Sequence, residues 1–119
     1  MISKFGIYVR EIRKKSNDSL RTMAKKLDVS AAFLSSMEVG RKMIPNEYVE
    51  KISNLYNLSE EERDKLEDSI NETNNRVSLE LEKMNEGQKE ISLMFSRKIK
   101  NADPELIEKL RKALSDEEN

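Results

Sequence analysis

Small side chains with hydroxyl or methyl groups gather early in this 119-residue chain: Ser30, Ala31, Ala32, Ser35 and Ser36. At helical spacing they share one exposed face, which carries no long polar side chain before Glu38. Serine donates or accepts hydrogen bonds at most base edges, and an alanine methyl group can contact a thymine methyl group. The face lacks the Arg, Asn or Gln that discriminates a base pair by ~1–3 kcal/mol. If such a face met DNA, it would read bases with modest specificity, and the rest would come from backbone contacts and DNA shape.

Basic residues surround this face in three adjacent pairs: Lys14-Lys15, Lys25-Lys26 and Arg41-Lys42. Each pair is either a phosphate contact or an ordinary solvated helix face. Residues 1–58 contain 11 Lys and Arg against 6 Asp and Glu (+5), whereas residues 59–119 contain 11 against 17 (-6). This asymmetry predicts an N-terminal half that tolerates a polyanion, unless it is only a chance imbalance of solvated faces.

Composition predicts an all-helical protein with one modest core. Hydrophobic residues make up 36% of the chain and charged residues 38%, with 3 Gly and 2 Pro. Without Cys and His a disulfide is impossible and a zinc site is disfavoured, so we expect no metal and no cofactor. No paired carboxylates or phosphate-binding glycine loop predict catalysis, and we expect no enzyme. No apolar run of about 18 residues or signal-like start appears, which predicts a cytoplasmic protein without membrane contact.

The hydrophobic spacing predicts helices near 3–15, 20–27, 31–38, 46–57 and 59–74. Ser19, Ser30 and Ser59 are expected to cap three of them, with Gly40 as a left-handed stop. Beyond residue 75 we expect a short helix over 79–84 capped by Ser78, an interruption at Gly87, and a helical stripe over 91–102. A last helix should begin at Asp103-Pro104, because proline behind an Asp cap favours a helix start.

The segment around residue 28 has the pattern of two short helices that cross steeply. Ala24 provides the small side chain where the helices touch, and Val29 provides the apolar residue inside the turn. Asp28 falls where a positive φ is expected, which Asp tolerates better than most residues. Leu34 and Met37 then close the core from the second helix. The pattern is typical of a helix-turn-helix.

Residues 5–58 resemble the Cro and phage-repressor type (xenobiotic-response-element) helix-turn-helix family. The resemblance rests on "FGIYVREIRKKS", "LRTMAKKLDVSAAFLSSMEVGRKMIP" and "YVEKISNLYNLSEEE". The later "ISLMFSRKIKN" and "ELIEKLRKAL" are similar to tails of some bacterial and mobile-element regulators. The resemblance implies a five-helix repressor-like DNA-binding domain, residues 1–74, with a C-terminal helical extension, residues 75–119.

The family resemblance also implies how double-stranded DNA would be bound. The reading helix would present Ser30, Ala31, Ala32, Ser35 and Ser36, and Arg41 and Lys42 would contact phosphates. Where the family usually has a phosphate-binding Gln, this sequence has Leu20, so Ser19, Arg21 or Thr22 would have to replace that contact.

Apolar residues at helical spacing continue into the C-terminal half: Ile91, Phe95, Ile99, Leu106 and Leu110. They either fold back to complete the same core, or form a hairpin for dimerisation or partner binding. The leading hypothesis is a sequence-specific regulator, a repressor that binds a palindromic operator as a homodimer. One alternative is an antitoxin or adaptor whose acidic C-terminal half binds a basic protein. Another is a helix-turn-helix scaffold that has lost DNA binding.

Overall fold

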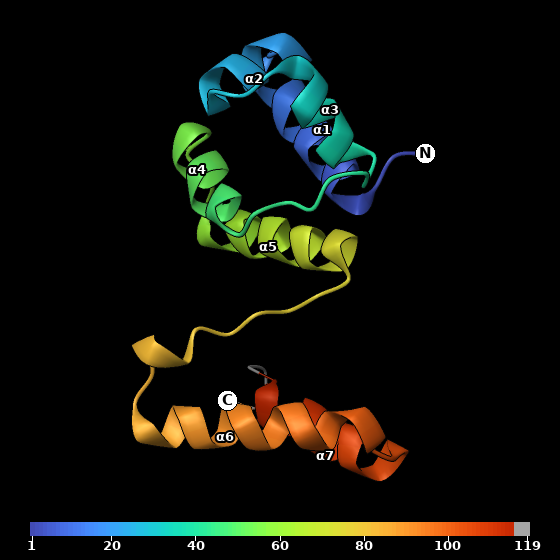
Figure 1. The fold of residues 1–119 in the computed structure, drawn as a ribbon, viewed down its shortest axis with the longest axis vertical. Helices are drawn as coiled ribbons and strands as arrows, with labels where there is room; N and C mark the ends of the chain where they lie inside the picture. Colours follow the sequence, from blue (N-terminus) through green and yellow to red (C-terminus); the bar gives the residue numbers. More distant parts are fainter. Residues whose placement is uncertain (116–119) are drawn as a thin grey trace. The chain divides into compact units, whose positions relative to one another are not determined.

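A computed structural model describes residues 1–115, and every regular element among them is a helix (Figure 1). The expected all-helical fold is therefore confirmed. The chain divides into a first unit, Met1–Val77, and a second unit, Ser78–Asn119. The end of the expected C-terminal region, residues 116–119, lies outside the described part. None of the helices within residues 1–115 is long and apolar enough to cross a membrane.

Five helices close to the expected ranges build the first unit: α1 (Lys4–Ser16), α2 (Leu20–Leu27), α3 (Ala31–Glu38), α4 (Glu47–Leu55) and α5 (Glu60–Asn74). Each contributes apolar side chains to one core, where burying a large aliphatic or aromatic side chain contributes about 1.5–3 kcal/mol. The core members with at most 1% exposure are Phe5, Val9, Met23, Leu34, Met37, Ile44, Ile52, Leu66 and Ile70. This core holds the two short helices of the corner against α1 and α4.

Serine side chains start four of these helices by accepting a hydrogen bond from a backbone N–H three residues ahead: Ser3, Ser19, Ser30 and Ser59. Ser59 and Glu62 also form the full capping box that the sequence predicts. Left-handed residues end α1, α2 and α5, namely Asn17, Asp28 and Asn75. The local sequence therefore determines both ends of α2 and the start of α3, the two helices that form the corner.

The second unit contains the 3₁₀ turn η1 (Leu81–Lys83), α6 (Glu86–Lys98), the 3₁₀ turn η2 (Ile99–Asn101) and α7 (Pro104–Leu114). Asp103 caps α7 and Pro104 begins it, as expected. Two expectations were wrong. In place of the expected helix over 79–84 there is only the short turn η1. The residue at its cap position is Glu80, which forms no side-chain cap, and Ser78 does not cap it either.

Gly87 does not interrupt the chain but lies in the first turn of α6. Asn85 and Gln88 form a capping box there: the Asn85 side chain accepts from the Gln88 N–H at 2.8 Å, and the Gln88 side chain accepts from the Asn85 N–H at 3.0 Å. The first N–H groups of a helix have no partner inside it, so a box of this kind initiates a helix even with glycine in its first turn.

Candidate nucleic-acid interface

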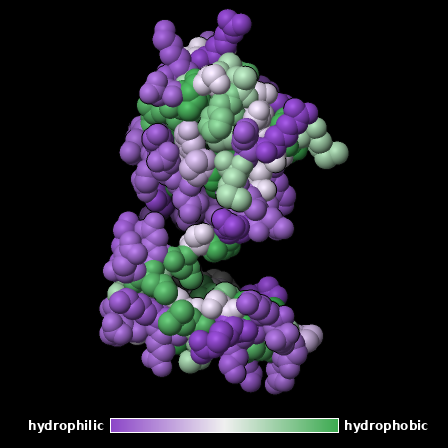
Figure 2. Space-filling view, viewed as in Figure 1, coloured by the Kyte–Doolittle hydropathy of each residue, from purple (hydrophilic) through white to green (hydrophobic). Residues whose placement is uncertain are grey.

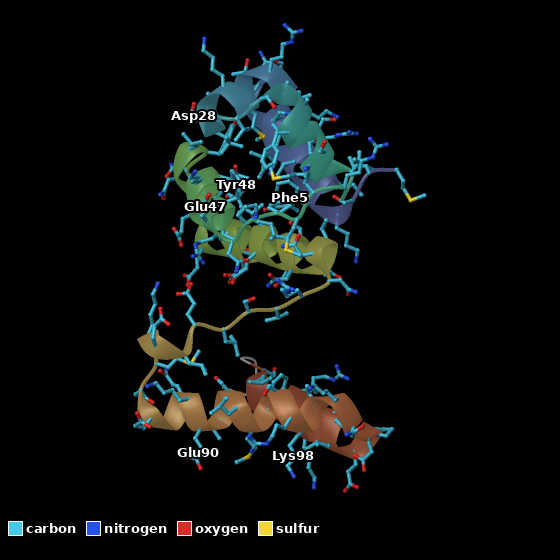
Figure 3. The ribbon with its side chains drawn as sticks, viewed as in Figure 1. Phe5, Asp28, Glu47, Tyr48, Glu90 and Lys98 are labelled. Atoms are coloured by element: carbon cyan, nitrogen blue, oxygen red, sulfur yellow. The ribbon has the colours of Figure 1, made fainter. Side chains whose placement is uncertain are left out.

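The corner between α2 and α3 has the geometry that its sequence predicts. Asp28, labelled in Figure 3, takes a left-handed φ of 62°, and its N–H donates to the Lys25 carbonyl at 3.1 Å. The Val29 N–H donates to the Ala24 carbonyl at 3.0 Å, and the Val29 side chain packs against the core. Ala24 is only 2% exposed. A larger side chain there would push the two helices apart.

The outer face of α3 carries the short side chains singled out by the sequence. Ala32 and Ser35 are exposed, while Ala31 and Ser36 are half-buried. The Ser30 Oγ accepts from the Phe33 N–H at 3.0 Å, so this hydroxyl serves first as the helix cap. Leu34 and Met37 are fully buried on the opposite side of the helix. Because the side chains on this face are short, the backbone of α3 can come close to a binding partner.

Arg41 and Lys42 directly follow α3 and project from an ordered turn. Gly40 is left-handed at φ 79°, its N–H donates to the Met37 carbonyl at 3.1 Å, and the Arg41 N–H donates to the Ser36 carbonyl at 2.9 Å. These two bonds form a Schellman motif, which fixes the direction in which the chain leaves the helix. Both basic side chains are exposed, and neither forms an ion pair within residues 1–115.

The loop that carries these two residues is tied to the end of α5. The Asn74 side chain accepts from the Ile44 N–H at 2.9 Å and donates to the Ile44 carbonyl at 2.8 Å. Ile44 itself is 1% exposed and belongs to the core. The basic pair is therefore held on a loop anchored at both ends, which lowers the entropy lost when it binds.

Arg21 lies beside α3 on the surface of the corner. A hollow of about 390 Å³ is lined by Arg21, Ala24, Lys25, Asp28, Val29 and Ala31. It brings the exposed Arg21 next to the first residue of α3, as a phosphate contact near the reading helix requires. Leu20, in contrast, is half-buried against the core. The position where the family has Gln is thus occupied here by a packing residue.

The remaining basic pairs, Lys14-Lys15 and Lys25-Lys26, contain side chains with and without partners. Lys26 is engaged: its Nζ lies 2.7 Å from a carboxylate oxygen of Asp18 and 5.1 Å from the centre of the Tyr56 ring. The Tyr56 hydroxyl donates to the same carboxylate at 2.8 Å. Burial is the largest cause that raises the pKa of Tyr56, and this hydrogen bond is the second, so the phenol stays protonated. Lys26 therefore helps connect α2 to the end of α4, while Lys14 and Lys25 stay exposed without an ion-pair partner within residues 1–115.

The residue that sequence reasoning placed wrongly is Glu38. Expected on the exposed face of α3, it is 1% exposed and points inward. Its carboxylate accepts from Arg13 at 2.5 and 3.3 Å and from the Arg10 Nε at 3.2 Å. Arg13 is 8% exposed, so the two charges neutralise each other inside the unit. This pair locks the end of α3 to the last turn of α1, and a buried carboxylate requires such a partner.

Gly6 permits that close contact between α1 and α3. A Cβ at Gly6 would lie 2.3 Å from the Glu38 carbonyl oxygen, far inside van der Waals contact. The same carbonyl accepts from the Ser3 N–H at 2.9 Å and the Ser3 Oγ at 2.8 Å. A glycine inside an otherwise helical pattern, as here, is the sequence signal that could have located the crossing.

These features define a class of protein: two short packed helices joined by a left-handed corner, supported by three further helices, form a helix-turn-helix domain. Comparison with known families gives the same result, because residues 4–66 match the family described as "Helix-turn-helix domain", which is more than half of the chain. The protein belongs to this helix-turn-helix family. Neither the curated proteins nor the solved structures contain a match. The narrower resemblance to Cro and phage repressors stays a prediction.

Proposed function

We propose that the protein is a sequence-specific DNA-binding transcriptional regulator of the cytoplasm, a repressor that binds a palindromic operator as a homodimer. One observation carries this proposal: the low, uncovered face of α3 is flanked by exposed basic side chains without ion-pair partners within residues 1–115, at Arg21, Arg41 and Lys42. Family membership supports the DNA-binding part. Repression and the homodimer are our inferences from the arrangement of the chain.

In the proposed complex α3 enters the major groove, where its short side chains allow close approach to the bases. Ser35 and Ser36 hydrogen-bond base edges, and the alanine methyl groups contact thymine methyl groups. Arg21 on one side and Arg41 with Lys42 on the other neutralise phosphates and fix the register. A single such helix binds weakly, so two copies about 34 Å apart, one helical turn, would share an operator.

The phosphate contacts give the direct test of DNA binding. The double variant Arg41→Ala, Lys42→Ala should weaken binding to all duplex sequences similarly, because it removes sequence-independent contacts. A plot of log affinity against log salt concentration should become shallower by about 1–2 units, since each phosphate neutralised contributes a slope of about -0.9. Fluorescence anisotropy at four salt concentrations measures both quantities.

The matched control is Lys51→Ala with Lys65→Ala, which removes the same charge from exposed positions on α4 and α5. It should leave the slope within half a unit of wild type, by the same counterion relation. An unchanged slope in the Arg41 and Lys42 variant would remove these residues from the interface. Absence of any DNA binding by the wild type would contradict the proposed function itself.

The reading face has a separate prediction. Ser35→Ala and Ser36→Ala should leave folding unchanged, since neither residue belongs to the core, but the preferred DNA sequence should change or broaden. Affinity for unrelated DNA should persist because the phosphate contacts remain. Selection of bound sequences from a random pool, for wild type and both variants, measures this. An identical preferred sequence in all three proteins would place base readout elsewhere.

A second candidate function is supported by the second unit, which exposes an apolar groove between α6 and α7. An antitoxin or adaptor would use the acidic C-terminal half, residues 59–119, to bind a basic protein, with DNA binding secondary or lost. The half-buried Leu20 at the family's phosphate-contact position favours weakened DNA binding. The salt titration above separates the two functions, because an adaptor without DNA binding gives no salt-dependent affinity.

A further inference from the structure

The second unit presents apolar side chains that its own helices leave uncovered. None of residues 78–115 is buried, and Figure 2 shows hydrophobic residues exposed between hydrophilic ones on this unit. A groove of about 430 Å³ between α6 and α7 is lined by Ile91, Met94, Phe95, Lys98, Ile99, Leu106 and Leu110. A unit this small without a buried core needs a second surface to be stable.

One edge of α6, which we call the rim, carries charges of opposite sign on either side of the groove residue Met94. Glu90 lies one turn before Met94 on α6, and Lys98 one turn after it. Figure 3 shows both charged side chains leaving the same side of α6. Eight residues separate them, about 12 Å along a helix, which is too far for them to pair with each other. Within residues 1–115 neither forms an ion pair with any other residue.

We propose that a second copy of this chain covers the groove, with its α6 antiparallel to the first and a two-fold axis near Met94. This arrangement specifies the contact within the homodimer proposed above, and therefore rests on it. It places Glu90 of each copy beside Lys98 of the other, so one axis creates two ion pairs. The parallel arrangement would oppose Glu90 to Glu90 and Lys98 to Lys98.

The apolar part of the groove fits the same arrangement. Met94 is 39% exposed at the centre of the rim, and Phe95 is 39% exposed beside it, so both remain available to a facing helix. Antiparallel α6 helices, with α7 of each copy alongside, form a four-helix bundle in which these side chains become core. Antiparallel helix dipoles also attract each other, which adds to the charge pattern.

Charge reversal on the rim tests the orientation. Glu90→Lys opposes a lysine to Lys98 of the second copy, and Lys98→Glu opposes a glutamate to Glu90, twice per dimer in each case. Each single variant of the full chain should weaken dimerisation about tenfold or more, as expected for repulsion at two sites. The double variant restores opposite charges and should return the dimer dissociation constant to within about threefold of wild type. Sedimentation velocity over a concentration series measures all four proteins.

Controls and outcomes separate this inference from the homodimer itself. Glu61→Lys and Lys65→Glu make the same charge changes on α5, a helix of the first unit, and should dimerise like wild type. Circular dichroism verifies that every variant remains helical. A wild-type dimer whose single variants dimerise normally, or whose double variant is as weak as the singles, overturns the antiparallel arrangement and leaves the homodimer standing. A wild type that is monomeric at tens of micromolar overturns both.

Discussion

Replacing Glu38 by alanine should lower the free energy of unfolding of the first unit by about 3–5 kcal/mol. The change leaves Arg13, which is 8% exposed, as a buried guanidinium whose carboxylate partner is missing. Breaking one side of a buried ion pair is among the most destabilising single changes, because the remaining charge keeps its desolvation penalty. Urea unfolding of the full chain, followed by circular dichroism, measures the loss.

Two controls identify the cause. Glu72→Ala removes a carboxylate whose ion pair with Lys4 is exposed, with side-chain exposures of 57% and 68%, and should change the free energy by less than about 1 kcal/mol. Arg10→Ala removes only the half-exposed partner of Glu38 and should likewise have a small effect. A Glu38→Ala protein within about 1 kcal/mol of wild type would show that the pair does not hold α3 in place.

Replacing Phe95 by aspartate should convert the proposed dimer to a monomer and reduce operator affinity by about 10²-fold or more. Phe95 lines the groove of the second unit, and an aspartate there would place a charge in the apolar contact between copies. The two half-sites would then bind separately and lose the advantage of linkage. Sedimentation gives the oligomeric state, and anisotropy with an operator selected from random DNA gives the affinity.

The control is Leu114→Asp, a change of the same kind at an exposed residue outside the groove, which should remain dimeric. The fold-back alternative makes a different prediction for the Phe95 variant. If the stripe completed the core of its own chain, Phe95→Asp would lower the melting temperature and leave the oligomeric state of the folded protein unchanged. One variant and two measurements therefore decide between the alternatives.

Local signals predicted most of the first unit. Ser30 as a cap, Asp28 with a positive φ and Gly40 as a stop depend only on near neighbours, and each is confirmed. Residues whose role depends on a distant helix were missed. Glu38 is polar and lies at the end of a short helix, so its near neighbours predict exposure. Its burial is explained by the ion pair with Arg13, 25 residues earlier.

The second unit was predicted less well, for a related reason. Gly87 was expected to break a helix, but the hydrogen bonds of Asn85 and Gln88 initiate α6 across it. The apolar residues expected to form one stripe do line a common groove, built from α6, the turn η2 and α7: Ile91, Phe95, Ile99, Leu106 and Leu110. Their function stays a prediction, because the sequence of these two helices does not specify the partner surface that covers the groove.

The end of α5 connects the beginning of the first unit to the loop that follows α3 and carries Arg41 and Lys42. The Thr73 hydroxyl accepts from the Phe5 N–H at 3.0 Å, and its neighbour Asn74 holds Ile44 in the loop behind Arg41 and Lys42. During synthesis, therefore, residues 20–42 emerge well before the segment that braces them. Domains generally fold as units, and contacts this distant in sequence form late. The nascent chain should gain the proposed DNA affinity only after Asn74 has emerged, so a truncated translation product would not compete for the proposed operator.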